Sequence, residues 1–313
     1  MERSKYTGKI AVIGAGNIGA TVAYSLLMNK LCNEIAIVDI AKDKASGEAL
    51  DMQHATSFSN PVMIRDGDYT ECADADLIVV TAGIPRKPGQ TRIELAQVNV
   101  AVARDIAGNI KENSVNPLIV VVTNPVDVIT YVIRKELGLS PDRCIGTGTS
   151  LDTARLRYAC AAQLKMDVRD MNVYMCGEHG DTMFPVWSCA SVGGAPLKDL
   201  LESSGANCEE ILARTVDGGA EIIRKKGATV YGIASATTKI VSAIMNNENA
   251  VLSLSRVQEN EFMGVSDVAL SLPYVINRTG IVNSLPIAMN DSEKESFVAS
   301  ADKLKSVISE VVK

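Results

Sequence analysis

The sequence predicts an α/β fold, with an N-terminal doubly wound parallel sheet and a C-terminal α+β part. Short apolar runs alternate with helical stretches over the first half of the 313 residues. After about residue 150 the pattern changes to longer helices followed by alternating strand patterns. Strands that alternate with helices favour parallel βαβ units, whose right-handed crossovers cover both faces of the sheet. We therefore expect two domains, residues 1–149 and 150–313.

The first half supplies five expected strands, each a short run rich in branched apolar residues. They are Lys9–Ile13, Glu34–Ile40, Pro61–Arg65, Leu77–Thr81 and Leu118–Thr123. The expected helices run from a glycine turn to about Lys30, over Lys42–Ser57, over Arg92–Lys111, and onward from Pro125. Proline is tolerated at the first helical position because an N–H group would have no partner there.

The second half begins with an expected helix and then becomes less regular. A glycine-rich stretch follows the helix, and two helical segments are split near a further glycine. Two long alternating patterns then predict strands, and a last helix closes the chain. These segments are Asp152–Leu164, Gly177–Gly194, the split at Gly227, Ala250–Gln258, Val265–Asn277 and Ser292–Val312.

Composition and charge exclude several classes of protein. The net charge is −6 and no Lys/Arg run is present, which disfavours nucleic acid and anionic membrane as partners. The N-terminus lacks an apolar signal core, and the apolar runs are too short to span a bilayer. Seven scattered cysteines without a CxxC pair, and only two histidines, favour reduced thiols in a cytoplasmic protein without a metal site.

A glycine pattern follows the first expected strand. Gly14, Gly16 and Gly19 form GxGxxG between an apolar run and an amphipathic helix. In this context Gly14 permits a tight turn, Gly16 lets the backbone approach a pyrophosphate, and Gly19 allows the helix to pack on the strand. The helix N-terminus, which includes Asn17 and Ile18, would offer N–H donors and a positive dipole end to the phosphates. The pattern predicts a dinucleotide-binding site.

Asp39 indicates which dinucleotide the site would take. It lies 20 residues after Gly19, at the end of the second expected strand. A carboxylate there can accept hydrogen bonds from the ribose hydroxyls and would repel a 2′-phosphate, so it favours NAD over NADP. The alternative interpretation is an aspartate that caps the following turn or helix.

His179 is the candidate for proton transfer, because the pKa of histidine suits movement of a hydroxyl proton near neutral pH. A carboxylate partner would orient its ring, and Asp152 is the candidate. Asp181 is nearer in sequence, but a residue two positions away in an extended segment would point elsewhere. The alternative interpretation is a structural role, because a single histidine considered without its neighbours is more often structural than catalytic.

Three polar residues are candidates for substrate contacts. Arg155 falls on the same helical face as Asp152 and could bind a substrate carboxylate through two parallel hydrogen bonds. Arg92 could polarise a carbonyl as negative charge develops on its oxygen. Asn124 follows a strand at the sheet edge where ligands bind. Solvent-facing arginines and a turn asparagine are the alternative interpretations.

Together these residues resemble the lactate/malate dehydrogenase family across nearly the whole chain. The matching stretches are GAGNIG, AIVDI, TAGIPRKPGQTR, VVTNPVDVIT, GTGTSLDTARLR, GEHGDT and KGATVYGIA. The resemblance implies hydride transfer between NAD and C2 of a small 2-oxo or 2-hydroxy acid. It implies His179 as acid/base, Asp152 as its partner, Arg155 as the carboxylate clamp and Arg92 as the carbonyl polariser.

The resemblance also divides the chain into an NAD-binding domain and a substrate domain. It implies that residues 84–94 form a lid, whose closure would expel water from the ligand. It implies a homotetramer, with a dimer as the next possibility. Further cofactor contacts are implied at Thr81, Ala82, Gly83, Asn99, Val122 and Asn124.

The substrate signals of the resemblance disagree with each other. Arg86 occupies the lid position where malate enzymes carry arginine, and it could pair with the second carboxylate of oxaloacetate. Facing the methyl group of pyruvate, an enclosed unpaired arginine would cost several kcal/mol. Thr229 and Ile233 instead look like the lactate pattern. Because more of the chain follows that pattern, we expect reduction of pyruvate to L-lactate. Malate dehydrogenase and a broader 2-hydroxy acid dehydrogenase are the alternatives.

Two further alternatives concern activity and regulation. An NAD-binding sensor on the same fold is the non-enzyme alternative, but it would be expected to lack part of the candidate catalytic set. Many bacterial lactate enzymes bind fructose 1,6-bisphosphate through an arginine and a histidine. Arg157 matches the first position and Asn172 occupies the second, so we expect little activation by this sugar phosphate.

Overall fold

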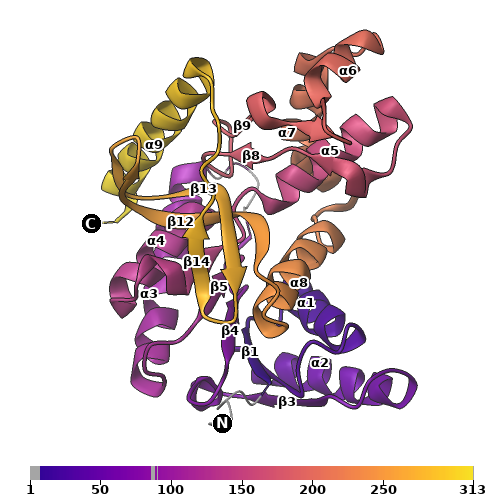
Figure 1. Ribbon diagram of the computed structural model, residues 1–313. Coiled ribbons are helices and arrows are strands. Elements are labelled where there is room, and N and C mark those ends of the chain that lie inside the picture. Colours follow the sequence, from indigo (N-terminus) through magenta and orange to yellow (C-terminus); the bar gives the residue numbers. More distant parts are fainter. Residues whose placement is uncertain (1–7, 86–88, 90, 313) are drawn as a thin grey trace, which may run out of the picture.

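The computed structural model describes residues 8–85, 89 and 91–312, and it is built around one long sheet (Figure 1). Within the described residues the sheet has nine strands in the order β14-β13-β12-β6-β5-β4-β1-β2-β3. The order starts in the centre and runs outward in both directions, as the expected doubly wound topology requires. The α/β fold class is therefore confirmed.

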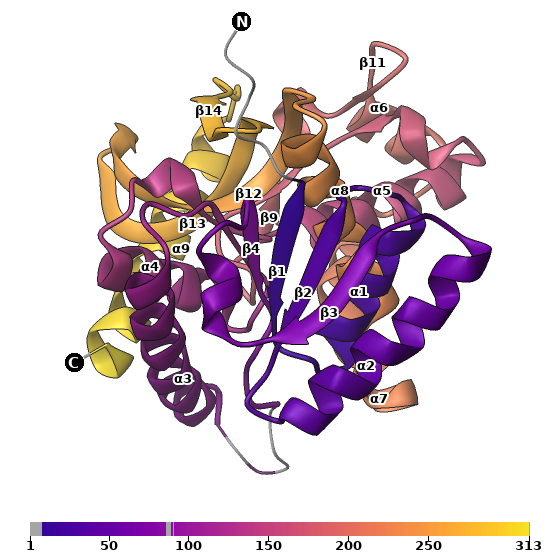
Figure 2. The ribbon, with the colours of Figure 1, turned by 90° about the horizontal axis from the view of Figure 1, so that it is seen from below.

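The parallel part of the sheet comes from the first half of the chain. Its strands are β1 (Lys9–Ile13), β2 (Glu34–Val38), β3 (Met63–Gly67), β4 (Leu77–Val80), β5 (Ile119–Val121) and β6 (Cys144–Gly146). The helices that connect these strands are α1 (Asn17–Met28), α2 (Lys42–Ala55), α3 (Arg92–Asn113) and α4 (Val126–Leu137). In Figure 2 α1 and α2 lie to one side of the strands and α3 and α4 to the other. Every residue of β1 and β4 is buried, as expected of strands covered on both faces.

Three antiparallel strands from the second half extend the same sheet. They are β12 (Ala250–Phe262), β13 (Val265–Asn277) and β14 (Gly280–Ser284). Ser255 of β12 pairs with Gly146 of β6, and this pairing joins the antiparallel and parallel parts. The strands β12 and β13 were expected in a separate second part, and β6 and β14 were not expected. Strands of three to five residues are too short to show a period that distinguishes them from loops.

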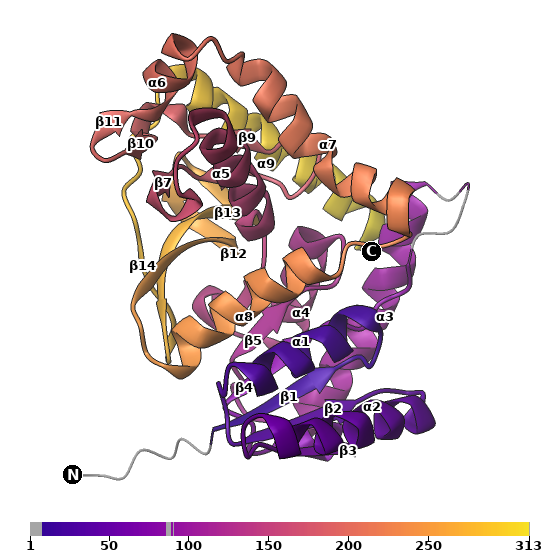
Figure 3. The ribbon, with the colours of Figure 1, turned by 90° about the vertical axis from the view of Figure 1, so that its right-hand side faces the viewer.

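Most of the remaining elements lie above the parallel part of the sheet in Figure 3, whereas α8 (Tyr231–Met245) runs beside α1 and α9 (Asp291–Val311) packs against β13. The other helices are α5 (Ser150–Leu164), α6 (Leu197–Ser203) and α7 (Cys208–Lys226). The short strands are β7 (Met171–Asn172), β8 (Met175–Cys176), β9 (Phe184–Pro185), β10 (Ser191–Val192) and β11 (Ala195–Pro196). Helix α8 crosses back onto α1, where the Thr238 hydroxyl donates to the Ser25 hydroxyl at 2.9 Å. This contact joins α8, from the second half of the chain, to the parallel part of the fold.

Element boundaries shift modestly from those expected. Pro125 is the residue before α4 and not its first turn, so its missing N–H still costs no helical hydrogen bond. The third strand runs over Met63–Gly67 and not Pro61–Arg65. The glycine-rich stretch of the second half contains β9, β10 and a turn of 3₁₀ helix at Trp187–Cys189. The seven cysteines form no disulfide among the described residues. No helix within the described ranges is long and apolar enough to cross a membrane.

Gly19 generates a test of the fold, because a Cβ atom there would lie 1.8 Å from the Gly14 carbonyl oxygen and 2.6 Å from the Thr81 hydroxyl. We expect Gly19→Ala to lower the unfolding free energy by about 1–3 kcal/mol or more, since the backbone must move. Gly47 is the matched control: it lies inside α2, and a Cβ there meets nothing within 4 Å. Gly47→Ala should be neutral or stabilise by ~0.5–1 kcal/mol.

The measurement is thermal or urea unfolding of the three proteins at one protein concentration. Equal effects of the two substitutions would contradict the close approach of helix and strand at Gly19.

Candidate active site

The candidate residues of the first half gather where parallel strands end. Gly14 follows β1, Thr81 follows β4 and Asn124 lies three residues after β5. Asp152 lies in the first turn of α5, which starts four residues after β6. Since these strands run in the same direction, their carboxyl ends share one edge of the sheet, which is where open α/β sheets bind ligands.

The glycine turn leaves space at one position and none at two others. Gly14 has φ of +109°, and a Cβ there would lie 2.6 Å from the Ala82 backbone nitrogen. Gly19 is closed in the same way. A Cβ on Gly16, however, would meet nothing within 4 Å. The turn is therefore packed against the sheet on one side and open at Gly16.

The open side fits a dinucleotide. Gly16 is the N-cap of α1, and no side chain caps this helix, so its first N–H groups and its positive dipole end are available to phosphate oxygens. Asp39 lies beside the turn: one of its carboxylate oxygens accepts from the Ala15 N–H at 2.6 Å and the other from the Ala41 N–H at 2.8 Å. Asp39 thus has a structural bond to the glycine turn in addition to its expected role toward a ribose.

The neighbouring strand ends are joined by hydrogen bonds around the turn. The Thr81 hydroxyl donates to the carbonyl oxygens of Ile13 and Gly14, both at 3.1 Å. The Thr123 hydroxyl donates to the Ala82 carbonyl at 2.8 Å, and the Thr123 methyl carbon lies 2.5 Å from the place of a Cβ on Gly83. Val122 N–H donates to the Val80 carbonyl at 2.8 Å. These hydrogen bonds hold the ends of the strands in place beside the glycine turn, where a cofactor would bind.

Asn99, expected as a cofactor contact, uses its amide within the protein. It is 2 % exposed, and its Nδ2 donates to the carbonyls of Asn124 and Ile84 at 2.8 and 3.2 Å. Its Oδ1 accepts from the Ile84 N–H at 2.8 Å. Asn99 therefore connects the start of the expected lid to the strand end that carries Asn124, a role that spacing along the sequence could not reveal.

Asp152 brings the two central candidates of the second half together. Its Oδ2 lies 2.6 Å from Nδ1 of His179, and its Oδ1 accepts from Nη1 of Arg155 at 2.9 Å. Asp152 is completely buried, whereas the side chains of His179 and Arg155 are 25 % and 17 % exposed. A buried carboxylate thus connects an imidazole and a guanidinium that both reach solvent.

The backbone explains why His179 reaches Asp152 although 27 residues separate them. Thr149 donates its hydroxyl to the Met175 carbonyl at 2.6 Å, and the Met175 N–H donates to the Thr153 hydroxyl at 3.0 Å. These bonds attach β8 to the first turn of α5. Because His179 follows β8 by only three residues, its ring arrives beside the first turn of that helix.

The charges of this group support one another. Burial lowers the pKa of His179, but the charge and hydrogen bond of Asp152, together with Asp127, raise it more, so the net shift is upward. Burial alone would raise the pKa of Asp152, but His179 and Arg155 lower it below its ordinary value. At neutral pH Asp152 is therefore a carboxylate that favours a protonated His179.

Asp127, Ser255 and Ser300 were not predicted as site residues. Asp127 and Ser300 contact the segment that carries His179, and Ser255 contacts Asp127. Asp127 accepts from the His179 N–H at 2.7 Å, and Ser300 accepts from the Glu178 N–H at 2.7 Å. Asp127 lies in the first turn of α4, where an acidic residue is ordinary, so the sequence carried no signal that it faces the interior. Ser255 and Ser300 belong to long regular elements and were equally inconspicuous.

The structure describes the remaining substrate-binding candidates only in part. Arg92 is the first residue of α3, and its side chain is outside the described parts of the structure. Arg86 lies outside the described residues. Thr229 is half-buried in the segment before α8. In the first turn of α8, a Cβ on Gly232 would lie 2.9 Å from the side chain of Leu151, the neighbour of Asp152. Thr229 is therefore close in sequence to a segment that packs beside the Asp152 turn.

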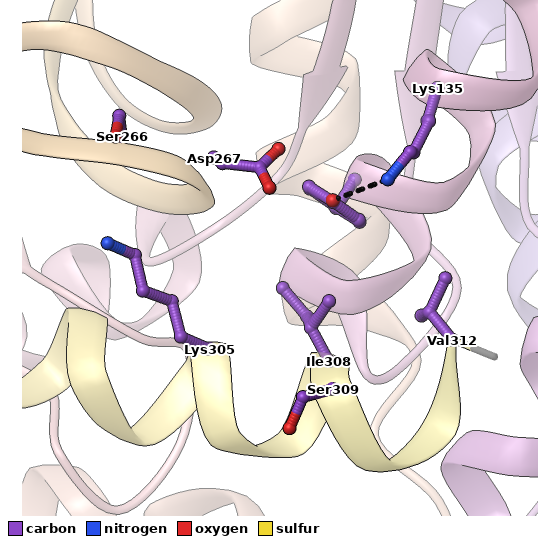
Figure 4. A pocket seen from close by; sticks show the side chains of 8 residues that line it. Lys135, Ser266, Asp267, Lys305, Ile308, Ser309 and Val312 are labelled. Carbon is purple, nitrogen blue, oxygen red and sulfur yellow. Dashed lines mark hydrogen bonds between the residues drawn. The ribbon is translucent and has the colours of Figure 1, made fainter.

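A separate pocket lies between α4, α9 and the β12–β13 hairpin (Figure 4). Lys135 donates to the Tyr131 hydroxyl at 3.0 Å there, and Asp267 and Lys305 line its rim. None of the candidate catalytic or cofactor residues lines this pocket. Among the described residues no group of three or more His, Cys, Asp or Glu side chains could hold a metal ion.

Comparisons with known proteins agree with this arrangement. An "L-lactate dehydrogenase 1" of Listeria innocua is 41% identical over 306 residues, which cover 97% of each chain. An "L-lactate dehydrogenase" of Lacticaseibacillus casei is 42% identical and covers 96% of this chain and 94% of its own. Among solved structures, a lactate dehydrogenase from a Medee basin deep-sea metagenome library superimposes with a TM-score of 0.93 at 38% identity. It covers 98% of this chain and 99% of its own.

The minor L-lactate dehydrogenase of Enterococcus mundtii has the same TM-score at 35% identity and covers 97% and 98% of the two chains. Residues 8–146 match the NAD-binding domain of the lactate/malate dehydrogenases, and residues 149–313 match their α/β C-terminal domain. The chain therefore belongs to the lactate/malate dehydrogenase family.

Proposed function

We propose that this chain is an L-lactate dehydrogenase that reduces pyruvate reversibly with NADH. The observation that carries the proposal is the group formed by His179, Asp152 and Arg155, in which one buried carboxylate connects a proton carrier and a carboxylate-binding guanidinium. The names of the relatives favour lactate over malate as the substrate class. In this proposal residues 1–149 bind NAD and residues 150–313 bind the substrate.

His179 would donate the proton that converts the carbonyl oxygen of pyruvate to a hydroxyl. Asp152 keeps Nδ1 of the ring occupied, which leaves Nε2 for the substrate. Because Asp152 favours the charged imidazolium, His179 would carry its proton in the complex that awaits reduction. In the reverse direction the neutral ring would accept the hydroxyl proton of lactate.

Arg155 would bind the substrate carboxylate. Asp152 engages Nη1 of its guanidinium, so the group is oriented before substrate arrives while other N–H donors stay available. Placing the carboxylate there would bring C2 and its oxygen toward His179. Arg92 would polarise the carbonyl, and Asn124 would contact substrate and cofactor at the strand end. Thr229 would contact the substrate from the other side.

Bound NADH would supply the hydride for C2. Gly16, the uncapped start of α1 and Asp39 are the groups that would bind its phosphates and ribose. We retain NAD over NADP because the Asp39 carboxylate would repel a 2′-phosphate. Closure of residues 84–94 would expel water from the reacting atoms.

Regulation, assembly and location stay predictions. Arg157 donates Nε to the Val173 carbonyl at 3.1 Å, and its guanidinium lies 5.2 Å from the centre of the Tyr174 ring. These internal contacts, with Asn172 exposed nearby, support weak response to fructose 1,6-bisphosphate. A homotetramer in the cytoplasm is the assembly and location that we propose.

Replacement of Asp152 tests the proton-transfer role. We expect Asp152→Asn to lower kcat for pyruvate reduction about 10²- to 10⁴-fold, because the imidazolium loses its charged partner. The residual rate should fall off at lower pH than in the parent. Pyruvate reduction requires protonated His179, and removing the carboxylate lowers the pKa that Asp152 had raised.

The control is His54→Asn, which removes the other histidine at an exposed position of α2. It should leave both the rate and the pH profile unchanged. A normal rate and pH profile in Asp152→Asn would remove the Asp152–His179 pair from the proposed mechanism. Loss of activity in the control would contradict the assignment of the proton to His179 alone.

Substrate choice tests the lactate proposal against the malate alternative. We expect kcat/KM for pyruvate to exceed that for oxaloacetate by about tenfold or more, a difference of about 1.4 kcal/mol. The malate alternative rests on Arg86, which would pair with the second carboxylate of oxaloacetate.

The matched variant is Arg86→Gln, measured with both substrates by oxidation of NADH. If oxaloacetate is preferred by tenfold and Arg86→Gln reverses the order, the chain is a malate dehydrogenase and the lactate proposal is wrong.

A further inference from the structure

Three successive backbone N–H groups that lead to His179 are bound by three different elements. Gly177 donates to the Ser271 carbonyl of β13 at 3.0 Å. Glu178 donates to the Ser300 hydroxyl of α9 at 2.7 Å, and His179 donates to the Asp127 carboxylate of α4 at 2.7 Å. The backbone at His179 is thus fixed from the sheet and from two helices. Of the three acceptors, Asp127 alone is an ionisable side chain.

Asp127 lies in the interior. It is 2 % exposed, and its second oxygen accepts from the Ser255 hydroxyl at 2.5 Å. Ser255 is completely buried and pairs with Gly146, at the junction between the parallel and antiparallel strands. The carboxylate therefore connects α4, the middle of the sheet and the segment that carries His179.

Hydrogen bonding alone does not require a charge at this position. An asparagine of the same shape could accept from the His179 N–H and donate to the Ser255 hydroxyl. A buried carboxylate, by contrast, loses its hydration and is costly unless nearby positive charge compensates it. The group near enough to compensate is the imidazole of His179, which interacts electrostatically with Asp127.

We propose that Asp127 is a positioning residue that fixes the backbone of His179 and places a second negative charge near its imidazole. The inference rests on the proposed function, because it assigns His179 the proton of the reaction. Asp152 acts on the ring by direct contact, and Asp127 acts from the interior through the backbone bond and through its charge.

The pKa shifts of the two groups have the signs that this geometry leads us to expect. Burial raises the pKa of Asp127 to about 6, although Ser255 and His179 pull it down. The pKa of His179 is lowered by burial and raised more strongly by Asp152 and Asp127. Above about pH 6 Asp127 is therefore charged and favours the protonated ring; below that pH it becomes neutral and its contribution disappears.

Other charged groups lie near Asp127 and His179 and change their pKa values. Glu178 opposes ionisation of Asp127, and Arg155 opposes protonation of His179. Lys303 of α9 lies 3.4 Å from Glu178 and partly offsets its charge. The groups that face the pair are Asp152 and Arg155 from α5, Glu178 from the connecting segment, Lys303 from α9 and the Ser255 hydroxyl from β12.

The test is the pH dependence of kcat/KM for pyruvate with Asp127→Asn. Pyruvate reduction needs protonated His179, so activity falls as pH rises through the pKa of that group. We expect the midpoint of this fall to move to lower pH by about 1 unit, because the substitution keeps the two hydrogen bonds but removes the charge. The rate on the acidic plateau should change less than the rate at neutral pH.

Two further variants separate charge from shape. Ser300→Ala removes the hydroxyl that accepts from the neighbouring Glu178 N–H without changing charge, so it should lower kcat with an unchanged midpoint. Ser255→Ala should move the midpoint in the same direction as Asp127→Asn but by less. Loss of the Ser255 hydrogen bond raises the pKa of Asp127 and neutralises it over part of the range.

The outcomes are distinguishable. If the parent protein reduces pyruvate but neither Asp127→Asn nor Ser255→Ala moves the midpoint, the charge of Asp127 has no role and the inference is wrong. The same conclusion follows if Ser300→Ala moves it equally. If the parent itself does not reduce pyruvate, the proposed function fails independently. Should Asp127→Asn not fold, Ser255→Ala still decides the question.

Discussion

The arrangement at His179 depends on one interaction, the hydrogen bond between Nδ1 of His179 and the buried carboxylate of Asp152, 2.6 Å apart. Taken alone, a fully buried carboxylate is unfavourable, so it needs both of the positive groups that it contacts. Because Asp152 contacts both groups, the imidazole of His179 and the guanidinium of Arg155 lie close together where the site meets solvent. The same group that would bind a substrate carboxylate therefore helps to keep the proton carrier's partner ionised.

Contacts from several elements of the fold bring these groups together. The Met175 carbonyl of β8 accepts from the Thr149 hydroxyl at the start of α5. The backbone N–H groups of residues 177–179 donate to a carbonyl of β13, a hydroxyl of α9 and a carboxylate of α4. Ser255 pairs with Gly146 and so joins the parallel and antiparallel parts of the sheet. Its hydroxyl also donates to Asp127, which contacts the His179 backbone. The site is therefore built across the join between the two family domains.

The sequence predicted what depends on local pattern. The alternation of strands and helices, the GxGxxG turn, the position of Asp39 after the second strand and the placement of Asp152 and Arg155 on one helical face could all be predicted from neighbouring residues. The pairing of β12 with β6 could not be predicted in this way, because it consists of one residue pair, Ser255 with Gly146, and produces no periodic pattern in the sequence. The roles of Asp127 and Asn99 could not be predicted from neighbouring residues either, because Asp127 bonds the backbone 52 positions away and Asn99 the backbone 15 and 25 positions away.

The most direct test is an NMR titration of His179 itself. With two histidines in the chain, His54→Asn leaves His179 as the only imidazole signal. We expect His179 to titrate above 6.5, the ordinary pKa of histidine, and Asp152→Asn to lower the midpoint of its titration. A midpoint at or below 6.5, or one that does not respond to Asp152→Asn, would contradict the claim that the buried carboxylate maintains the proton on His179.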